Sequence, residues 1–417
     1  MMTLPKDWHL GSVSDFVDAL DAGVSLKCGD EPAGVGDIGV LKVSCVSSGC
    51  FRPSENKKLP TGEEPKTREW PRQGRILISR CNTRALVGVS AYVEEDYPDL
   101  RLPDKLWQTT YRTEVTFSPR WLAYALQAPY ARSLLGRLAS GTSGSMKNLS
   151  KATVMSLPVP VPPMPEQRKI GEILRTWDNA IAKLICLLTA KVSLKEVLAA
   201  KLLADVAREV TTGKVRLATF ALPTLRARPK PMCPFKGLGL RSHCKGTFLK
   251  HDVRPETVGA SELYEVFEGD LIVNITFAWE GAIAIATRAD DHALVSHRFP
   301  TYVFDTGVIL PGYFRQVMTQ KWFLGKLLLL SPGGAGRNRV LSKKEFESIE
   351  VMLPTIEAQQ RVASTLAACE REIELLTRQL QVLRRQKKGL MQKLLTGELR
   401  VKVEGAEGEG GADGEGK

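Results

Sequence analysis

Apolar residues recur at alternating steps of four and three in two stretches of the chain, one after Pro165 and one after Pro354. This spacing places the apolar side chains on one face of a helix, at the a and d positions of a coiled coil. The pattern therefore predicts two long helices, each with a single apolar seam. The seams consist of Ile170, Leu174, Trp177, Ile181, Leu184 and Leu188 in the first helix, and of Val362, Leu366, Ile373, Leu376, Leu380 and Leu383 in the second.

The two predicted helices most simply pair with each other. A helix from Pro165 to Leu203 would be about 58 Å long at 1.5 Å per residue. If the globular parts lie at opposite ends, the connections require an antiparallel pair, which acts as a rigid spacer between two binding surfaces. The alternative is that each amphipathic helix packs separately on its own domain.

The helical pattern is part of an internal repeat. A shift of 192 residues places Leu149-Ser150-Lys151 on Leu341-Ser342-Lys343, Gln167 on Gln359, and Asp178 on Glu370. A period of this length is too long for a solenoid unit, so it indicates two copies of a half-protein.

The region before each predicted helix contains short strand-like runs followed by a helical pattern. The predicted strands are residues 75–79, 86–92, 271–275, 282–286 and 301–304, and helices are predicted near 119–138 and 311–330. Strands followed by helices indicate mixed domains. The sequence thus predicts an α+β fold: two globular domains separated by two long antiparallel coiled-coil helices, with a pseudo-twofold internal repeat. The predicted segments are a first domain over 1–155, a first spacer helix over 156–205, a second domain over 206–345, a second spacer helix over 346–403 and an acidic, disordered tail over 404–417.

The charge of the chain points to a polyanionic partner. The formal net charge is +12, and the tail after Val403 is acidic, so the remainder is more basic still. A large positive charge favours nucleic acid before a membrane surface. The alternative is a generally basic protein that binds no polyanion.

A Gly-rich basic loop ends each predicted domain, over residues 141–148 and 333–339. Glycines allow backbone N–H groups to approach a phosphate closely, and lysine or arginine supplies the charge. The alternative is a flexible surface turn. The predicted phosphate contacts are Lys147, Asn148, Lys151, Arg337, Asn338, Arg339, Lys343 and Lys344.

Several catalytic signatures are absent from the sequence. It has no phosphate-binding P-loop motif, no dinucleotide-binding glycine motif, no amino-methyltransferase motif and no zinc-protease motif. Cys233, His243, Cys244 and His251 lack the tight pairs of a zinc site, so core or surface thiols are expected instead of a metal site. The N-terminus lacks the apolar core of a signal peptide, and we expect a cytoplasmic protein.

Four segments together resemble the DNA-sequence specificity subunits of type I restriction-modification systems. They are Leu157-Pro158-Val159-Pro160-Val161-Pro162-Pro163-Met164-Pro165-Glu166-Gln167, the ending Leu394-Leu395-Thr396-Gly397-Glu398-Leu399-Arg400-Val401, the opening Leu4-Pro5-Lys6-Asp7-Trp8, and Gly269-Asp270-Leu271-Ile272-Val273-Asn274 with its following strand. The resemblance covers about residues 4–403. The second copy departs from it at residues 353–360, which lack the proline doublet, so partner docking there is expected to differ in detail.

The resemblance implies a non-catalytic subunit that binds double-stranded DNA, with each domain reading one half of a split site. It also implies that the helices dock two modification methyltransferase subunits, which bind S-adenosylmethionine, and that a motor-nuclease using ATP and Mg joins them. The chain itself would hold no cofactor. The predicted base-reading residues are Arg80, Asn82, Arg84, Asn274, Trp279 and Arg298. Two alternatives remain: a coiled-coil scaffold without DNA readout, and a metal-dependent nuclease.

Overall fold

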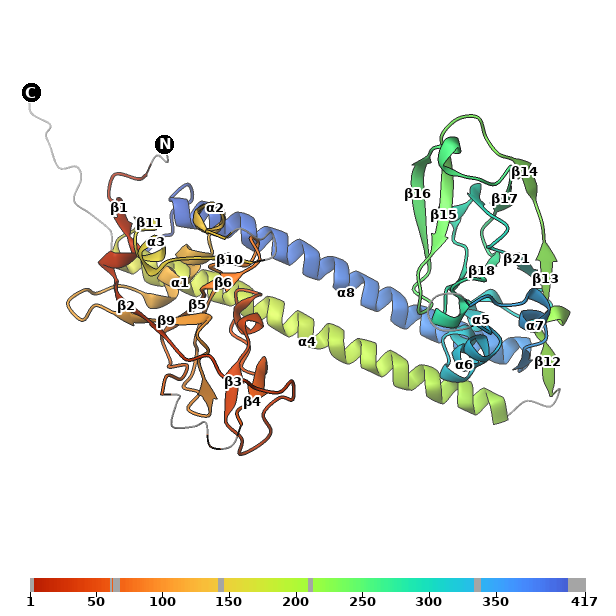
Figure 1. The fold of residues 1–417 in the computed structure, drawn as a ribbon, viewed down its shortest axis with the longest axis horizontal. Helices are drawn as coiled ribbons and strands as arrows, with labels where there is room; N and C mark the ends of the chain where they lie inside the picture. Colours follow the sequence, from red (N-terminus) through yellow and green to blue (C-terminus); the bar gives the residue numbers. More distant parts are fainter. Residues whose placement is uncertain are drawn as a thin grey trace, which may run out of the picture. The chain divides into compact units, whose positions relative to one another are not determined.

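The computed structural model describes residues 4–60, 62, 68–141, 146–208, 213–333 and 339–403. The chain folds into two compact units, Met1–Ile185 with Gln379–Lys417, and Cys186–Arg378. Two long helices, α4 (Met164–Arg208) and α8 (Ile356–Thr396), contribute to both units (Figure 1). The first unit is therefore assembled from two separate stretches of the chain, and the second from a single stretch.

The first unit is built on a four-stranded sheet in the order β2-β9-β5-β7, in which all neighbours are antiparallel. A three-stranded sheet, β4-β3-β8, and the pairs β1-β11 and β10-β6 complete its strands. The bounds are β1 His9–Ser12, β2 Val17–Ala22, β3 Gly39–Leu41, β4 Asn56–Lys58, β5 Ile76–Ser79, β6 Cys81–Asn82, β7 Ser90–Tyr92, β8 Leu100–Arg101, β9 Leu106–Tyr111, β10 Lys147–Asn148 and β11 Pro158–Val161.

The helices of the first unit cover this sheet. They are α1 (Pro119–Gln127), α2 (Pro129–Leu138) and α3 (Lys151–Met155). The sequence predicted one helical stretch over 119–138, but the helix stops at Ala128. Proline disfavours the helical conformation of the residue before it, and Ala128 accordingly has the extended angles φ −56° and ψ 144°. The core centres on Trp121 of α1, which is fully buried.

The second unit repeats the four-stranded sheet as β13-β21-β18-β19 and adds a five-stranded sheet, β14-β17-β20-β15-β16, and the pair β12-β22. The bounds are β12 Lys214–Arg216, β13 Ala221–Thr224, β14 Ala227–Pro229, β15 Phe235–Leu240, β16 Thr247–Val253, β17 Glu262–Val266, β18 Leu271–Val273, β19 Ile283–Ile285, β20 Ala293–Val295, β21 Thr301–Phe304 and β22 Glu350–Met352. Both units thus combine sheets with helices, as the α+β prediction required.

Two short helices, α5 (Pro311–Met318) and α6 (Lys321–Leu329), and the single turn α7 (Lys343–Glu347) complete the second unit. The predicted helix over 311–330 is again divided, here at Thr319 and Gln320. Aromatic side chains fill the core between α5, α6 and the sheet, with Phe314 and Phe323 fully buried and their ring centroids 5.7 Å apart.

A buried glutamine fixes the start of each long helix. The Gln167 amide nitrogen donates to the Pro162 carbonyl at 3.0 Å, and its oxygen accepts from the Ser118 N–H at 2.9 Å. Gln359 makes the same pair of bonds, with the Pro354 carbonyl at 3.0 Å and the Leu310 N–H at 2.8 Å. Because Ser118 and Leu310 immediately precede α1 and α5, each glutamine ties a long helix to the short helix of its own unit.

The two long helices pair antiparallel within each unit. Lys191 and Lys195 of α4 contact Glu372 and Glu370 of α8, so the partner number falls as the α4 number rises. The apolar seam of the sequence faces inward along its whole length: its members are buried or half-buried. The ends of the seam join the cores of the units. Ile170 and Leu174 pack with Leu394 and Leu395, and Val362 and Leu366 with the second core.

Candidate nucleic-acid interface

A tight turn follows the central strand β5 in the first unit. This first candidate turn, residues 80–88, is closed by the Leu86 and Val87 N–H groups, which donate to the Thr83 carbonyl at 3.0 and 2.8 Å. The Arg132 guanidinium of α2 donates to the Val87 carbonyl at 2.8 Å and to the Ala85 carbonyl at 3.0 Å. Burial lowers the pKa of Arg132 to about 10, and the side chain serves to hold the turn.

The first candidate turn lies beside the end of the first Gly-rich loop. β10 pairs with β6, so that Lys147 is opposite Asn82 and Asn148 is opposite Cys81. The Leu149 N–H then donates to the Arg80 carbonyl at 3.0 Å. The structure therefore brings together residues that the sequence assigned separately to base reading and to phosphate contact.

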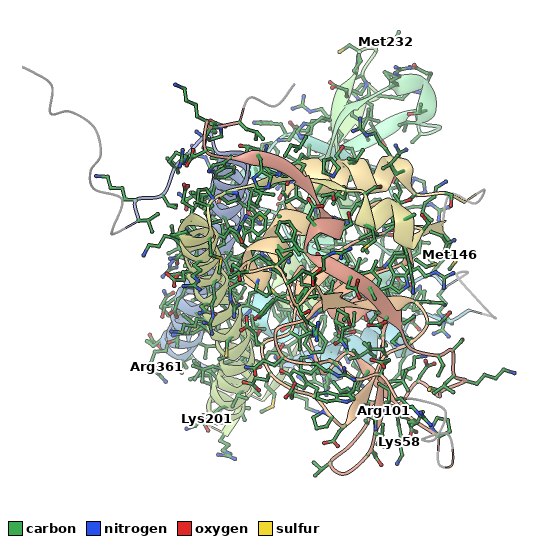
Figure 2. All side chains as sticks on the ribbon, turned by 90° about the vertical axis from the view of Figure 1, so that its left-hand side faces the viewer. Lys58, Arg101, Met146, Lys201, Met232 and Arg361 are labelled. Carbon is green, nitrogen blue, oxygen red and sulfur yellow. The ribbon has the colours of Figure 1, made fainter. Side chains whose placement is uncertain are left out.

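These side chains differ in exposure. Arg80, Arg84 and Lys151 are exposed, whereas Asn82, Lys147 and Asn148 are half-buried. The Lys147 ammonium donates to the Gly141 carbonyl at 2.5 Å. Met146, which precedes it, is 48% exposed, and Figure 2 shows this residue at the edge of the molecule. Met146 thus faces solvent beside the pairing of β10 with β6.

A second candidate turn, residues 275–281, follows β18 in the second unit. The Trp279 indole N–H donates to the Thr276 carbonyl at 3.2 Å, and the Arg298 guanidinium donates to the Thr276 hydroxyl at 3.2 Å. Asn274 is 9% exposed, and its side-chain oxygen accepts from the Thr276 N–H at 3.1 Å. Asn274 thus shapes the turn from inside, while Arg298 is exposed on it.

The end of the second Gly-rich loop reaches the second candidate turn. The Arg339 guanidinium carbon lies 5.5 Å from the centroid of the Trp279 ring, a cation–π contact. The Leu341 N–H donates to the Ile275 carbonyl at 2.9 Å, and Lys343 and Lys344 are exposed at the start of α7. The predicted contacts Arg337 and Asn338 lie outside the described residues.

The two candidate turns are built alike. Leu149 donates to Arg80 in the first unit, and Leu341 donates to Ile275 in the second. Gly88 and Gly281 close the turns with φ of 71° and 73°, a region that glycine enters without strain. An added Cβ would meet Arg132 and Leu135 at Gly88, and Leu324 at Gly281. The repeat found in the sequence is therefore also a repeat of local geometry.

Lys105 is a candidate contact that the sequence reasoning missed. The Arg80 N–H donates to the Lys105 carbonyl at 2.9 Å, and the Ile275 N–H donates to the Arg298 carbonyl at 3.1 Å, so Lys105 stands where Arg298 stands in the other unit. Lys105 is exposed and lines a cleft of about 280 Å³ with Lys42 and Lys57. The only sequence signal was a basic residue directly before a strand, which is too common to single out.

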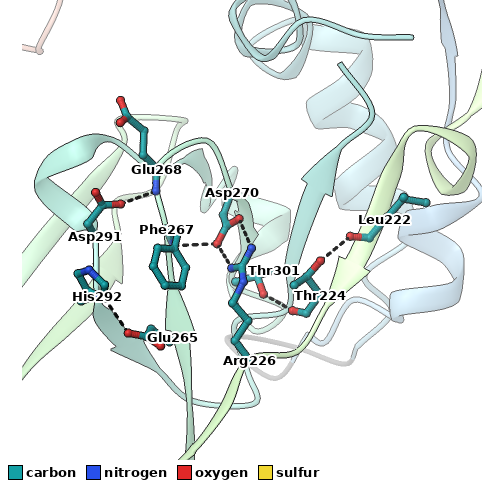
Figure 3. Close-up of polar contacts among 10 residues, drawn as sticks. All are labelled: Leu222, Thr224, Arg226, Glu265, Phe267, Glu268, Asp270, Asp291, His292 and Thr301. Carbon is teal, nitrogen blue, oxygen red and sulfur yellow. Dashed lines mark hydrogen bonds and ion pairs between the residues drawn. The ribbon is translucent and has the colours of Figure 1, made fainter. Parts of the chain in front are cut away.

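Not every basic side chain of the second unit is available to a ligand. Arg226 pairs with the buried Asp270 at 2.5 and 3.1 Å (Figure 3), and Arg228 donates to Glu265 at 2.9 Å. His292 contacts the same Glu265 carboxylate at 2.8 Å. Hydrogen bonds from His292 and Arg228 lower the pKa of Glu265 against the opposing effect of burial. These residues hold β13, β14 and β17 to their sheets.

The described ranges contain neither a metal-binding cluster nor a membrane-spanning helix. No cluster of three or more histidine, cysteine, aspartate or glutamate side chains among them is arranged to hold a metal ion. In particular, Cys233, His243, Cys244 and His251 form no such group there. None of the described helices is both long and apolar enough to cross a membrane.

Comparison with known proteins decides the family. The family described as type I restriction modification DNA specificity domain matches residues 5–186 and 256–385, most of the chain. The chain belongs to this family. Family membership assigns it to type I restriction-modification, with a function in DNA sequence recognition.

Known type I specificity subunits are similar to this chain over different lengths. The EcoEI specificity subunit of Escherichia coli is 31% identical over 168 residues, which are 40% of this chain and 28% of that protein. The chain thus aligns with less than a third of that relative. The putative MjaX specificity subunit of Methanocaldococcus jannaschii is 21% identical over 96% of this chain and 95% of its own length.

Solved structures of type I specificity subunits share the fold. The S subunit from M. genitalium matches with a TM-score of 0.59 at 13% identity, over 94% of this chain and 98% of that one. A chain from a structure titled for the assembly and conformational transition of the type I restriction-modification system matches with a TM-score of 0.51 at 14% identity, over 95% of this chain and all of that one. Such low identities bear on the fold alone.

Proposed function

We propose that the chain is the DNA-reading subunit of a type I restriction-modification complex and that each candidate turn reads one half of a two-part site. The duplication of the turn carries this proposal. In both units a turn after the central strand lies beside a basic residue, Lys147 or Arg339, and beside an exposed cation, Lys105 or Arg298. Two equivalent basic surfaces suit a ligand that presents two stretches of one polyanion.

The chemistry of these side chains matches DNA contact. Lysine and arginine neutralise phosphates and set the position of the protein, whereas arginine and asparagine read base edges in the major groove. Arg80 and Arg84 are exposed and suited to base edges. Arg298, which the sequence assigned to base reading, stands in the place of Lys105, and both are suited to phosphates, as is Lys147. Asn274, which is buried in the turn, acts by supporting the turn rather than by touching a base.

The long helices are proposed to dock two modification methyltransferase subunits. Apolar side chains on α4 and α8 support this role, because they face solvent outside the seam: Leu194 is 57% exposed, Val197 68% and Leu375 63%. Contiguous exposed apolar side chains mark interaction sites, and Leu194 and Val197, three residues apart on α4, share one face of that helix. Lys201 and Arg361, on the outer side of the same helices in Figure 2, are exposed as well.

The chemical steps are assigned to the partners. S-adenosylmethionine would be bound by the methyltransferase subunits, and ATP with Mg by the motor-nuclease subunits. This chain would contribute recognition without a catalytic site, in the cytoplasm, where its DNA is found. The family match favours this role over a scaffold without DNA readout and over a metal-dependent nuclease.

Methylation mapping tests the proposal. The chain is co-expressed with a type I modification methyltransferase subunit, and modified adenines are located by long-read sequencing. We expect a split motif of two short half-sites. Exchanging residues 206–345 for those of another family member should change one half-site and leave the other unchanged. A continuous motif, or the loss of both half-sites together in a folded chimera, would contradict the two-reader proposal.

A further inference from the structure

A carboxylate on each long helix joins three elements of its unit. In the first unit, Asp178 of α4 accepts a hydrogen bond from the Tyr124 hydroxyl of α1 at 2.7 Å and one from the Lys387 ammonium of α8 at 2.5 Å. In the second, Glu370 of α8 pairs with Lys195 of α4 at 2.7 Å and accepts from the Gln316 amide of α5 at 3.3 Å. We call each arrangement a carboxylate junction.

The two junctions occupy the same places in the repeat. Adding 192 to Tyr124, Asp178 and Lys195 gives Gln316, Glu370 and Lys387. The carboxylate stays on one long helix and the lysine on the other, while the third partner changes from a phenol to an amide. The repeat therefore keeps a hydrogen-bond donor from the short helix, although its chemistry differs.

The lysines and carboxylates are largely removed from solvent. The side chains of Lys387 and Asp178 are 13% and 20% exposed, and those of Lys195 and Glu370 are 27% and 33% exposed. Burial opposes the charge of Glu370, but the hydrogen bond and charge of Lys195 outweigh burial, so the pKa of Glu370 is lowered. Burial and the charge of Asp178 raise the pKa of Tyr124, which keeps its hydroxyl as a donor.

The inward faces of α1 and α5 pack in the cores of their units, whereas each junction lies beside an open pocket. A cavity of about 190 Å³ is lined by Tyr124 and Asp178, and one of about 330 Å³ is lined by Lys195, Gln316 and Glu370. On that side of each short helix, the hydrogen bonds and ion pair of the junction supplement the core packing in setting the orientation of the helix.

A short mechanical path leads from each junction to a candidate turn. α1 packs on β7, the strand that leaves the first candidate turn, and α5 packs on β19, the strand that leaves the second. A rotation of α1 about Asp178 of α4, or of α5 about Glu370 of α8, would therefore move the candidate turn of the same unit.

We propose that the carboxylate junctions are positioning devices that set the angle at which each unit presents its candidate turn, and thereby the separation of the two DNA half-sites that the complex accepts. This inference rests on the proposed function. Asp178, Lys387, Lys195 and Glu370 act through the short helices and touch no DNA.

The test replaces the lysines with isosteric neutral residues in the complex of the full chain with its methyltransferase partner. Lys195→Met and Lys387→Met remove one ammonium each and keep the alkyl stem. We expect unchanged half-site sequences, but a rise of at least about fivefold in the share of modified sites whose spacer is one base pair longer or shorter. Lys195→Arg keeps the charge and should retain the wild-type spacer.

Lys191→Met is the matched control. Lys191 lies one helical turn before Lys195 and pairs with Glu372 of α8 at 2.8 Å. Among the described residues, Lys191 is the only hydrogen-bond or ion-pair partner of Glu372. Lys191→Met removes the same charge and an ion pair between the long helices, but it leaves both junctions intact. The DNA spacer that the Lys191→Met complex accepts should therefore be that of the wild type.

The outcomes separate the two proposals. Thermal denaturation establishes whether the Lys195→Met and Lys387→Met complexes are folded. Folded complexes that keep the wild-type spacer would overturn the positioning role. If these variants do not fold, Tyr124→Phe, which removes one hydroxyl, decides in the same way: a relaxed spacer supports the role, and an unchanged spacer overturns it. A wild-type complex that modifies no two-part site would instead refute the proposed function.

Discussion

The side chains beside the two candidate turns differ in how freely they can reach a ligand. Arg226 and Arg228 are engaged by Asp270 and Glu265, so they add positive charge without adding a contact. Lys105 and Arg298 stand at equivalent exposed positions, of which the sequence identified only Arg298. The sequence could not show that Arg226 and Arg228 are engaged, because Asp270 and Glu265 lie 44 and 37 residues further along the chain.

Replacing Lys105 or Arg298 by alanine should weaken DNA binding at every sequence. Each loss of a phosphate contact is expected to reduce the slope of log K against log salt by about 1. The measurement is a salt titration of DNA binding by the assembled complex. Lys58→Ala is the control, because it removes the same charge from an exposed lysine that pairs with Asp37 at 2.8 Å. Equal slopes for all three variants would argue against the assigned contacts.

The lowered pKa of Glu370 predicts how the second junction responds to acid. A carboxyl group whose folded pKa is depressed stabilises the fold above its ordinary value of 4.5 and loses this contribution as the pH falls through the lower folded value. The wild type should therefore exceed Lys195→Met in free energy of unfolding by about 1 kcal/mol at neutral pH. Urea titrations between pH 7 and about 3 should show this difference shrinking below pH 4.5.

At the scale of elements, the long helices were predictable and the short strands only partly so. A seam repeated over many residues is a strong local signal, and α4 and α8 follow it. Strand β21 has the predicted bounds, whereas the run at 86–92 contains the end of the first candidate turn before β7 begins at Ser90. Strands of two or three residues, such as β6 and β10, depend on each other for pairing and leave no periodic pattern.

The break between α1 and α2 could have been predicted from the residue type. Pro129 stands inside the predicted helix and excludes a continuous one. By contrast, the meeting of Lys147 with Asn82 depends on β10 crossing to β6, a contact between distant parts of the chain. The sequence thus named the separate parts of the candidate site, but which of them lie side by side came only from the structure.

Glycine 88 is expected to be essential to the first candidate turn. In Gly88→Ala the new Cβ would lie 2.8 Å from Leu149 Cδ1 and 2.9 Å from Leu135 Cδ1, at a φ of 71° that alanine adopts only with strain. We expect a loss of about 2 kcal/mol or more in free energy of unfolding.

The matched control for this substitution is Gly74→Ala. Gly74 has a similar φ of 81°, but its nearest neighbour, the Tyr92 hydroxyl, is 3.9 Å from the added Cβ. Gly74→Ala should lower the free energy of unfolding by about 1 kcal/mol, from backbone strain alone. Chemical denaturation of both variants measures the free energy of unfolding that each substitution removes. Equal reductions in the two variants would show that movement of the neighbouring side chains relieves the crowding at Gly88.

At the scale of the whole molecule, the repeat found in the sequence recurs as two units whose equivalent residues make equivalent bonds. The sequence alone also divided the chain into consecutive segments, with boundaries at 155, 205 and 345. The structure groups residues differently, because the last part of α8 packs into the first core through Met391, Leu394 and Leu395. A division by sequence order cannot reveal a core that closes with residues from the far end of the chain.

Truncation of the chain after Arg378 should destabilise the first unit and leave the second unit stable. It keeps all residues of the second unit but removes Met391, Leu394 and Leu395 from the first core and Lys387 from its junction. We expect amide hydrogen exchange to remain slow in β18 and α5 and to become fast in β5 and α1. Loss of protection in both units would mean that they fold as one cooperative block.

The discontinuous first unit has a consequence for biosynthesis. Arg400 contacts Asp7 and Glu166, so the last described turn of the chain closes on its beginning. On the ribosome, residues 186–378 emerge as a complete set, while residues before 186 must wait for those after 378. The nascent chain therefore carries an unfinished first core while residues 186–378 are made, and the exposed leucines and tryptophans of that core are what a chaperone at the exit tunnel would meet.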